Sequence, residues 1–599
     1  MHQKIIQGIL IILALSFAVP AGAAGEFTAD YDVDYAISPN GKTIVTQNVT
    51  LTNKLTNLYP KQYTISLDTT EIDNVIAYDD GGVIKPEIKQ NDSKTEIVLD
   101  FSQKIVGLGK KSKFSLRFEN NTIAQKNGTI WEVNIPGITP DPDIGEYSVS
   151  LQIPPNFGTN AYLVPLPSNG RRWTKDQMTS GGISASYGTE QTFEVILTYY
   201  LENLLVNNRQ IQIALPPDTS YQRVLINSLE PKPVNINKDE DGNWLALYEL
   251  TPRQKLEVTA HLSISIYLKS RDDYPLSNVS TDVYVAKQRY WEVDNPLIIN
   301  LARLYPTPRS IYTFVKDKLK YDYARIKQVP LRKGALGALN NPDSAVCMEF
   351  TDLFIAIARA AGIPAREAIG FAYTTNSKLR PLSLASDVLH SWPEYYDREK
   401  NLWIPVDPTW ANTTGGVNYF DKLDFNHIVF AYHGISSEYP YPAGFYKRKD
   451  QQSKDVTVNF AQTTTRFAQG KVNLKFDFPK SVLSGTTAKG QLLIENQTNQ
   501  SVTILQAEIL ASPVNFYLEK KGFNLPPYAK IFLPIEIKVE NLFLSGRAKL
   551  VANVNGETVQ YFFEVRPIYY LGLIICFFVL VLLLGIYLLI FRPKIRLWR

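Results

Sequence analysis

The sequence Cys347-Met-Glu-Phe-Thr-Asp-Leu-Phe-Ile-Ala-Ile-Ala-Arg-Ala-Ala361, followed by Gly362-Ile-Pro364, decides the fold of the centre of this 599-residue chain. Its large apolar residues recur at the spacing of one helical face: Phe350, Leu353, Phe354 and Ile357. We therefore expect a helix that begins near Cys347, buries this face and stops at Gly362-Ile-Pro364.

The thiol of Cys347 is expected at the start of this helix, because Ser344 or Asp343 can act as the N-cap. Unsatisfied N–H groups and the helix dipole favour the thiolate there. The same N–H groups can receive a developing oxyanion. The position is that of a cysteine nucleophile.

Two strand-like segments downstream carry a histidine and an aspartate: Leu389-His-Ser-Trp-Pro-Glu-Tyr-Tyr396 and Asn401-Leu-Trp-Ile-Pro-Val-Asp407. We predict a hairpin around Asp397-Arg-Glu-Lys400 in which Tyr396 faces Asn401. That register places His390 opposite Asp407, with both side chains on one face. The register also pairs Glu394 with Trp403 and Trp392 with Pro405. His390 and Asp407 are then neighbours, as a catalytic base and its orienting carboxylate must be.

The chain has two cysteines, Cys347 and Cys576, and the second lies in an apolar segment that we assign to a membrane. A lone cysteine in an exported domain has no internal disulfide partner. This isolation favours a functional thiol at Cys347 over one that merely packs.

These segments resemble the transglutaminase-like superfamily over about residues 285–440. The cysteine helix with Arg359-Ala-Ala-Gly-Ile-Pro-Ala-Arg366 resembles that of the family, and His390-Ser-Trp-Pro-Glu394 and Trp403-Ile-Pro-Val-Asp-Pro-Thr409 resemble its histidine and aspartate strands. Lys320-Tyr-Asp-Tyr323 at the end of the upstream helices also fits. The cysteine is usually preceded by Gly-x, and here Ala345-Val346 stands instead.

The resemblance implies papain-like acyl transfer by Cys347, His390 and Asp407. The cysteine would attack a glutamine carboxamide or a peptide, the histidine would shuttle the proton, and an amine or water would resolve the thioester. For the second oxyanion donor, Trp291 and Asn341 are candidates. Trp392 is expected to pack under the histidine. No cofactor is expected.

The remaining sequence favours β structure on both sides of an α+β domain, because period-two alternation dominates from Glu26 to about Ser270 and again from about Val456 to Val565. Within the α+β domain, Leu297–Tyr305 and Ile311–Leu319 are expected to be helical. We predict a signal peptide (1–23), a β-sandwich (24–140), a β-rich domain (141–275), the transglutaminase-like domain (285–445), an Ig-like β-sandwich (456–566), a transmembrane helix (568–591) and a cytoplasmic tail (592–599).

Two apolar segments predict the topology. Lys4, an apolar run and Ala21-Gly-Ala23 are typical of a signal peptide. The charge-free run Ile568–Phe591 gives roughly 36 Å of helix, which is enough to cross a bilayer. Cations follow it at once: Arg592, Lys594, Arg596 and Arg599. The positive-inside bias then predicts a single-pass protein with its body outside the cytoplasm.

The net charge of +4 on 120 charged residues gives no reason to expect nucleic acid as a partner. No metal site is expected either. The segment Asn237–Gly242 resembles the start of a calcium loop but lacks the glutamate at the twelfth position, so a hairpin turn is the better interpretation. His427 and His433 lack a third ligand at suitable spacing and are interpreted as structural.

Three functions remain open on the sequence. The first is a cysteine acyltransferase acting on proteins or peptides at the cell surface. The second is a surface protease or amidase using the same three residues. The third is a surface module that binds without catalysis.

Overall fold

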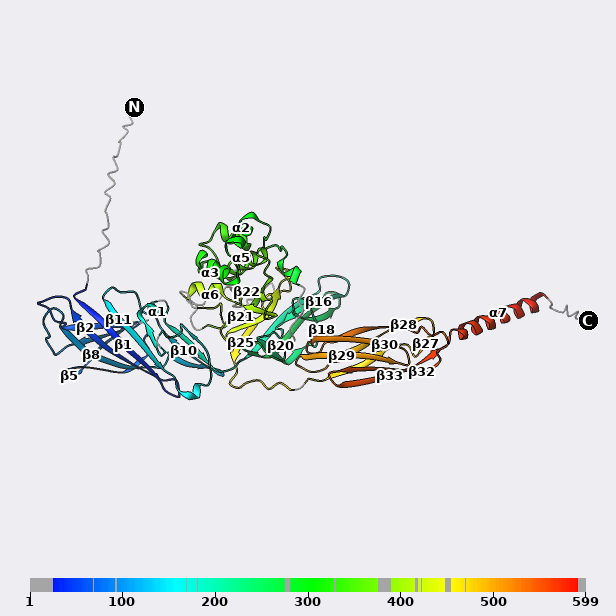
Figure 1. The fold of residues 1–599 in the computed structure, drawn as a ribbon, viewed down its shortest axis with the longest axis horizontal. Coiled ribbons are helices and arrows are strands. Elements are labelled where there is room, and N and C mark those ends of the chain that lie inside the picture. Colours follow the sequence, from blue (N-terminus) through cyan, green and yellow to red (C-terminus); the bar gives the residue numbers. More distant parts are fainter. Residues whose placement is uncertain are drawn as a thin grey trace, which may run out of the picture. The chain divides into compact units, whose positions relative to one another are not determined.

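The computed structural model describes residues 25–590, except for positions 68, 92–93, 169, 180, 275–280, 328–329, 375–388, 415–417, 422, 448–453 and 469. The predicted signal peptide and cytoplasmic tail lie outside the described residues. The chain divides into two compact units, residues 1–126 with 131–186 and residues 127–130 with 187–599. Strands dominate both units, and Figure 1 colours them along the sequence.

The first unit is built around a seven-stranded sheet with the order β13-β11-β1-β2-β8-β4-β5. Its elements are β1 (Phe27–Ile37), β2 (Thr43–Asn53), β3 (Gln62–Leu67), β4 (Ile72–Asp79), β5 (Gly82–Ile84), β6 (Glu87–Gln90), β7 (Thr95–Asp100), β8 (Lys111–Asn120), β9 (Ala124–Asn127), β10 (Ile130–Ile135), β11 (Ile144–Gln152), β12 (Asn160–Val164), β13 (Arg172–Thr174), α1 (Lys175–Thr179) and β14 (Ile183–Tyr187). Because β1 pairs in parallel with β11, the boundary placed at residues 140 and 141 falls inside this unit. The prolines near it belong to the loop between β10 and β11.

The second unit begins with two sheets that share one hydrophobic core. Its strands are β15 (Gln191–Glu202), β16 (Arg209–Leu215), β17 (Gln222–Glu230), β18 (Asn235–Lys238), β19 (Trp244–Leu250), β20 (Lys255–Ile266) and β25 (Val456–Phe460). The sheet orders are β17-β20-β15-β25 and β16-β19-β18. The calcium-like segment forms the turn of the β18–β19 hairpin, where the Asp239 carboxylate accepts the N–H of Asn243 at 2.8 Å. The chain thus returns to this sandwich through β25, although the sequence alternation from Val456 onward predicts that this segment belongs to the C-terminal sandwich.

Between β20 and β25 lies an α+β domain. It consists of α2 (Pro296–Leu304), α3 (Pro308–Lys318), α4 (Gly334–Asn340), α5 (Cys347–Ala360), β21 (Ala365–Ala372), β22 (Leu389–Asp397), β23 (Leu402–Pro405), α6 (Pro408–Thr413) and β24 (His427–His433). The sheet order is β23-β22-β21-β24. In Figure 1, α2, α3, α5 and α6 gather on one side of the sheet that contains β21 and β22. The sequence pattern predicted α2, α3, α5, β22 and β23 of these elements, and it missed the strands β21 and β24 and the short helices α4 and α6.

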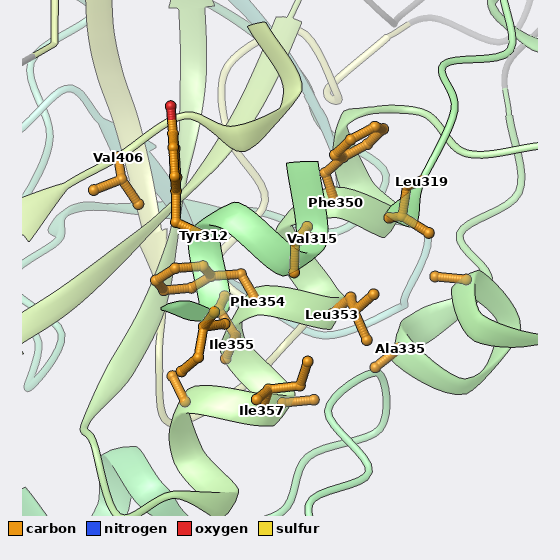
Figure 2. Packing of buried hydrophobic residues seen from close by; sticks show 14 of the residues in the cluster. Tyr312, Val315, Leu319, Ala335, Phe350, Leu353, Phe354, Ile355, Ile357 and Val406 are labelled. Carbon is orange, nitrogen blue, oxygen red and sulfur yellow. The ribbon is translucent and has the colours of Figure 1, made fainter. Parts of the chain in front are cut away.

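Helix α5 is the centre of the domain, and nearly all of its side chains are buried. Figure 2 shows its apolar residues packed against α3 and α4, with Phe354 and Leu353 close to Val315 and Ala335. A helix that is buried all round is held by its neighbours rather than by one amphipathic face.

Helix α5 ends at a glycine because the backbone turns left-handed there. Gly362 has φ of +78°. Its N–H donates to Arg359 O at 3.0 Å, and the next N–H, of Ile363, donates to Ala358 O at 2.9 Å. This is a Schellman ending, which satisfies carbonyls that the last helical turn leaves open. Cys347 and the start of the helix are thereby fixed relative to β21.

The C-terminal sandwich has its own hydrophobic core. Its strands are β26 (Val472–Asp477), β27 (Ser481–Leu483), β28 (Thr487–Asn496), β29 (Val502–Ser512), β30 (Phe516–Leu525), β31 (Lys530–Lys538), β32 (Gly546–Val554) and β33 (Glu557–Arg566). After β33 the chain enters α7 (Tyr569–Ile590), in which Gly572–Ile590 has a mean hydropathy of 3.3 and is long and apolar enough to cross a membrane.

Candidate active site

Cys347 is the first residue of α5, as predicted, but the cap differs from the prediction. The N-cap residue is Val346, and the carboxylate of Glu349 accepts the Val346 N–H at 2.9 Å. Ser344 instead donates its hydroxyl to Asp322, and Asp343 pairs with Lys320. A glutamate at the third helical position reaches back to the cap in this way in many helices. The side chain of Cys347 is buried.

The Glu349 carboxylate is held by more than the cap. Arg325 donates to it at 2.7 Å, and the N–H of Lys333 donates at 3.0 Å. Glu349 is fully buried, so these donors compensate for the loss of water around its charge. The start of α5 is therefore a rigid platform for the thiol.

His390 and Asp407 lie together, with Nε2 of the imidazole 2.9 Å from Oδ2 of the carboxylate. Both side chains are fully buried. Their contact was predicted, but the predicted register was wrong by two residues. Glu394 pairs with Pro405 and Tyr396 with Trp403, so β23 ends before it reaches His390.

Asp407 lies beyond the hairpin, as the N-cap of α6. Its Oδ1 accepts the N–H groups of Thr409 at 2.8 Å and Trp410 at 3.0 Å. One carboxylate oxygen therefore caps a helix while the other faces His390. This double attachment fixes the carboxylate more firmly than a strand position would.

The electrostatics of the pair favour charge on both partners. Burial opposes the charged imidazole, yet the charge and hydrogen bond of Asp407, with a further contribution from Cys347, raise the pKa of His390 to about 10. Burial likewise opposes ionisation of Asp407, but His390 and His427 hold the pKa of that carboxyl well below its usual range. The site thus stabilises an imidazolium between a carboxylate and a thiol.

His427 belongs to the same site, which corrects its interpretation as a purely structural residue. Its Nε2 lies 3.4 Å from Asp407 Oδ2, and its Nδ1 lies 2.8 Å from Asp424 Oδ1. Burial opposes its charged form, but Asp424 and Asp407 raise the pKa of His427. The sequence contains no sign that His427 belongs to the site. This histidine reaches Asp407 because β24 pairs with β21, a strand more than 50 residues earlier in the chain. His433, by contrast, lies in a buried network away from the site.

Aromatic rings surround the imidazole of His390. Trp392 is stacked on it with ring centroids 5.9 Å apart, which agrees with the predicted packing role. Trp410 of α6 is stacked at 5.1 Å. These rings exclude water from the histidine and restrict its rotation.

Neither predicted oxyanion donor fits. Trp291 is fully buried and donates its indole N–H to Asp352 at 2.9 Å. Asn341 is exposed at the end of α4.

Tyr321 lies beside the segment that leads into Cys347. It forms a parallel bridge with Ala345, two residues before Cys347, and the adjacent Asp322 N–H donates to Ala345 O at 2.8 Å. Among the described residues its buried hydroxyl has no hydrogen-bond partner. Burial and the nearby charge of Cys347 raise the pKa of Tyr321, so the hydroxyl keeps its proton.

In the described part of the chain, one group of side chains could hold a metal ion. His390, Asp407 and His427 each offer an atom within 4.8 Å of the others. Those atoms already face one another across the shared carboxylate oxygen, and the raised pKa of both imidazoles disfavours the neutral form that binds metals. The donor set fits a hydrogen-bonded chain better than a metal centre.

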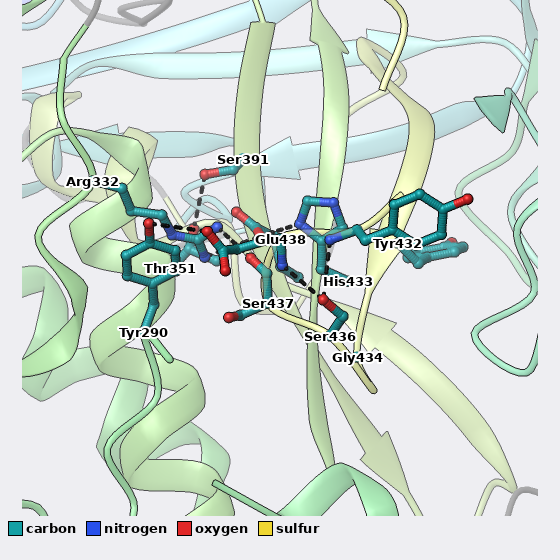
Figure 3. A network of polar contacts seen from close by, with 12 residues as sticks. Tyr290, Arg332, Thr351, Ser391, Tyr432, His433, Gly434, Ser436, Ser437 and Glu438 are labelled. Atoms are coloured by element: carbon teal, nitrogen blue, oxygen red, sulfur yellow. Dashed lines mark hydrogen bonds and ion pairs between the residues drawn. The ribbon is translucent and has the colours of Figure 1, made fainter. Parts of the chain in front are cut away.

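A buried ionic network behind the site joins α5 to the sheet. Arg332 contacts Asp352 of α5 at 3.0 Å and Glu367 of β21 at 3.0 Å. His433 of β24 contacts Glu367 at 2.8 Å and Pro440 O at 2.9 Å. Figure 3 shows this network between the helices and the strands. It sets the distance between the element that carries the thiol and the sheet that carries the histidine.

Comparisons with known proteins identify the domain. Residues 300–408, which include Cys347, His390 and Asp407, match the family described as the transglutaminase-like superfamily. Among solved structures, a proposed cysteine protease from Cytophaga hutchinsonii is 17% identical with a TM-score of 0.28, over 46% of this chain and 98% of that one. The CARDB domain of a Pyrococcus furiosus protein is 12% identical with a TM-score of 0.15, over 17% of this chain and 95% of that one. No curated protein matches. The chain therefore contains a transglutaminase-like domain.

Proposed function

We propose that this chain is a membrane-anchored, extracytoplasmic enzyme that transfers acyl groups from protein or peptide amides through a thioester on Cys347. The observation that carries the proposal is the buried contact of 2.9 Å between His390 and Asp407, in a site whose third member is a thiol at a helix start. A carboxylate, an imidazole and an activated thiol are the parts that nucleophilic acyl transfer requires.

The first half of the reaction forms the thioester. The sulfur of Cys347 bonds to the carbonyl carbon of a glutamine side chain, and the carbon–nitrogen bond breaks. His390 gives its proton to the departing nitrogen, so that ammonia leaves. Asp407 keeps the imidazole oriented and stabilises its cation before the transfer.

The second half releases the acyl group. A primary amine attacks the thioester carbon and gives a proton to His390 as the carbon–sulfur bond breaks, which regenerates the thiolate and imidazolium. Water in place of the amine gives hydrolysis. The two outcomes share every residue of the site, so exclusion of water decides between them.

Tyr321 is our candidate for the donor that stabilises the oxyanion. Its hydroxyl is protonated, buried and next to the cysteine segment, and it makes no competing hydrogen bond among the described residues. A buried hydroxyl without a partner costs free energy in the resting protein. That cost is recovered when a substrate oxygen becomes its acceptor. The dipole of α5 acts on the same charge.

The location rests on the two apolar ends of the chain. Helix α7 is compatible with a single membrane crossing, and the cations after Phe591 favour a cytoplasmic tail. The partners proposed are then protein or peptide substrates at the cell surface, with no nucleic acid.

The function is tested with full-length protein in detergent, a pool of glutamine-containing peptides and a primary amine. Mass spectrometry separates amine incorporation, deamidation and backbone cleavage. We expect incorporation by the wild type and none by Cys347→Ala. Deamidation or cleavage alone, if lost in Cys347→Ala, would assign a hydrolase instead. Unchanged peptides with both proteins would indicate a binding module.

A further inference from the structure

The C-terminal sandwich has an unusual apolar end at the point where α7 leaves it. The turn between β31 and β32 presents Leu542 and Phe543, whose exposed fractions are 46% and 80%. The side chain of Asn541 accepts the N–H of Phe543 at 3.0 Å, and its carbonyl accepts the N–H of Leu544 at 3.2 Å. The turn is therefore fixed with its apolar side chains pointing into solvent.

The same end holds the first residues of the membrane segment. The N–H of Ile568 donates to the Ser484 hydroxyl at 2.8 Å, and that hydroxyl donates to the carbonyl of Leu542. Tyr569 and Tyr570 follow, and each is about half exposed. The apolar turn and the start of α7 are thus joined through one serine.

Basic and aromatic residues surround this end. An open groove of about 980 Å³ is lined by Lys480, Arg547, Phe562, Pro567 and Tyr570, together with other residues of β33. Arg547 lies over the Phe562 ring at 4.0 Å.

The charges of this groove are only partly neutralised. Glu564 pairs with Arg566 at 3.2 Å. In the part of the chain that the structure describes, neither Lys480 nor Arg547 forms an ion pair with a carboxylate. The groove therefore keeps a net positive charge beside the start of α7.

We propose that this end of the sandwich docks on the outer surface of the bilayer that α7 crosses. Leu542 and Phe543 enter the interfacial layer, where aromatic and aliphatic side chains are stable. Lys480 and Arg547 contact the phosphates of anionic lipids. The inference rests on the proposed membrane anchor. The inference adds that α7 does more than link the chain to the membrane, because the C-terminal sandwich itself contacts the bilayer surface.

The alternative occupant, a partner protein, is less well supported. The apolar turn is tied to residues that continue directly into a segment of bilayer length. A lipid surface therefore lies beside the turn whenever α7 is inserted. A protein partner would have to compete with that surface for the same side chains.

The test uses full-length protein in vesicles of phosphatidylcholine and phosphatidylglycerol, with an environment-sensitive fluorophore on a single cysteine. Phe543→Cys is labelled in a Cys347→Ala, Cys576→Ala background. Leu505→Cys, 72% exposed on β29 beside the turn at Asn555, is the matched control. The native Cys576, labelled in Cys347→Ala alone, reports insertion of α7.

Brominated lipids quench a fluorophore that reaches the bilayer. We expect several-fold stronger quenching at position 543 than at 505, and strong quenching at 576. Equal, weak quenching at 543 and 505 with strong quenching at 576 would overturn docking and leave the anchor intact. Weak quenching at 576 as well would overturn both.

A second arm tests the lipid charge. Lys480→Ala with Arg547→Ala should weaken quenching at 543 in vesicles that contain phosphatidylglycerol, and should change little in phosphatidylcholine alone. The same quenching with and without the two cations in anionic vesicles would contradict the phosphate contact.

Discussion

Replacing Asp407 by Asn separates the two tasks of this side chain. In the wild type one oxygen accepts the N–H groups of Thr409 and Trp410, and the other faces His390. An asparagine has only one oxygen. If that oxygen keeps the cap, the amide N–H₂ faces Nε2 of the imidazole, and the remaining ring proton is forced onto Nδ1. If the amide flips, α6 loses its cap.

The structure sets the expected magnitudes. Loss of the carboxylate with the wrong histidine tautomer lowers kcat/KM on the order of 10⁴-fold, which corresponds to about 5 kcal/mol. At about pH 9, where most of the charge contribution of His390 is already lost, the free energy of unfolding changes much less, by about 1–2 kcal/mol, because either amide orientation preserves one set of hydrogen bonds. Catalysis and stability should therefore respond very differently.

The stability difference also depends on pH. The pKa of His390 is raised to about 10 in the folded protein, so its contribution is complete below an unfolded pKa of about 6.5 and is lost as pH rises through about 10. The pKa of Asp407 is lowered, so its contribution is present above about pH 4 and is lost as pH falls. The free energy of unfolding of the wild type should therefore exceed that of Asp407→Asn by the largest amount between about pH 4 and 6.5.

The assays are amine incorporation and chemical denaturation of the two proteins across this range. His390→Ala with Asp407→Asn should be no slower than His390→Ala alone, since residues that act as a unit are not additive. If the activity losses of the two single variants instead multiply in the double variant, His390 and Asp407 do not act as a pair. A loss of activity no larger than the loss of stability explains would refute the pairing as well.

Three other substitutions test neighbouring parts of the site. His427→Gln should lower kcat by about 10- to 100-fold through misplacement of Asp407, with KM nearly unchanged; an unchanged kcat would remove His427 from the site. Tyr321→Phe should lower kcat by about 10²- to 10³-fold without loss of stability, because the hydroxyl has no partner to lose among the described residues; destabilisation with full activity would contradict its role. Arg332→Met should cost about 3–5 kcal/mol of unfolding free energy, because it leaves the buried Asp352 carboxylate without a cation. Arg289→Met removes an exposed ion pair, in which 69% of the arginine side chain is accessible, and should change the unfolding free energy by less than about 0.5 kcal/mol. Equal effects of the two substitutions in denaturation would refute the importance of burial.

The sequence was sufficient to predict the bounds of α5, because the residues that start and end this helix lie within or next to it. The apolar spacing, the glycine stop and the proline after it coincide with the observed helix, which begins at the predicted residue. The predicted cap was wrong because Glu349 satisfies the Val346 N–H from inside the helix, whereas Asp343 and Ser344 lie before it.

The hairpin register was misjudged because of its turn. The Asp397 carboxylate accepts the N–H groups of Glu399 and Lys400, and Asn401 adopts a left-handed conformation with φ of +52°. The loop is therefore 398–401 rather than 397–400. Asp407 followed by Pro408 carried a further local signal, since an aspartate before a proline is a common helix start.

His427 and Tyr321 could not be assigned from local patterns. Each reaches the site through pairing between segments distant in sequence, β24 with β21 and Tyr321 with Ala345. Spacing along the chain does not predict such pairings when the order of strands in a sheet differs from their order in the sequence. His390 and Asp407 were paired correctly because they are only 17 residues apart in the sequence, one on a short hairpin and the other just beyond its end.

The central claim is that Cys347 is an activated nucleophile, and its alkylation rate tests this most directly. Full-length protein is treated with iodoacetamide across a pH series, and modification of Cys347 is followed by peptide mass spectrometry. We predict alkylation below pH 7 that is faster than that of free cysteine, and a return to ordinary thiol behaviour in His390→Ala. A wild-type rate that rises only at about pH 8.5, as for an unassisted thiol, and that is identical in His390→Ala would contradict the claim.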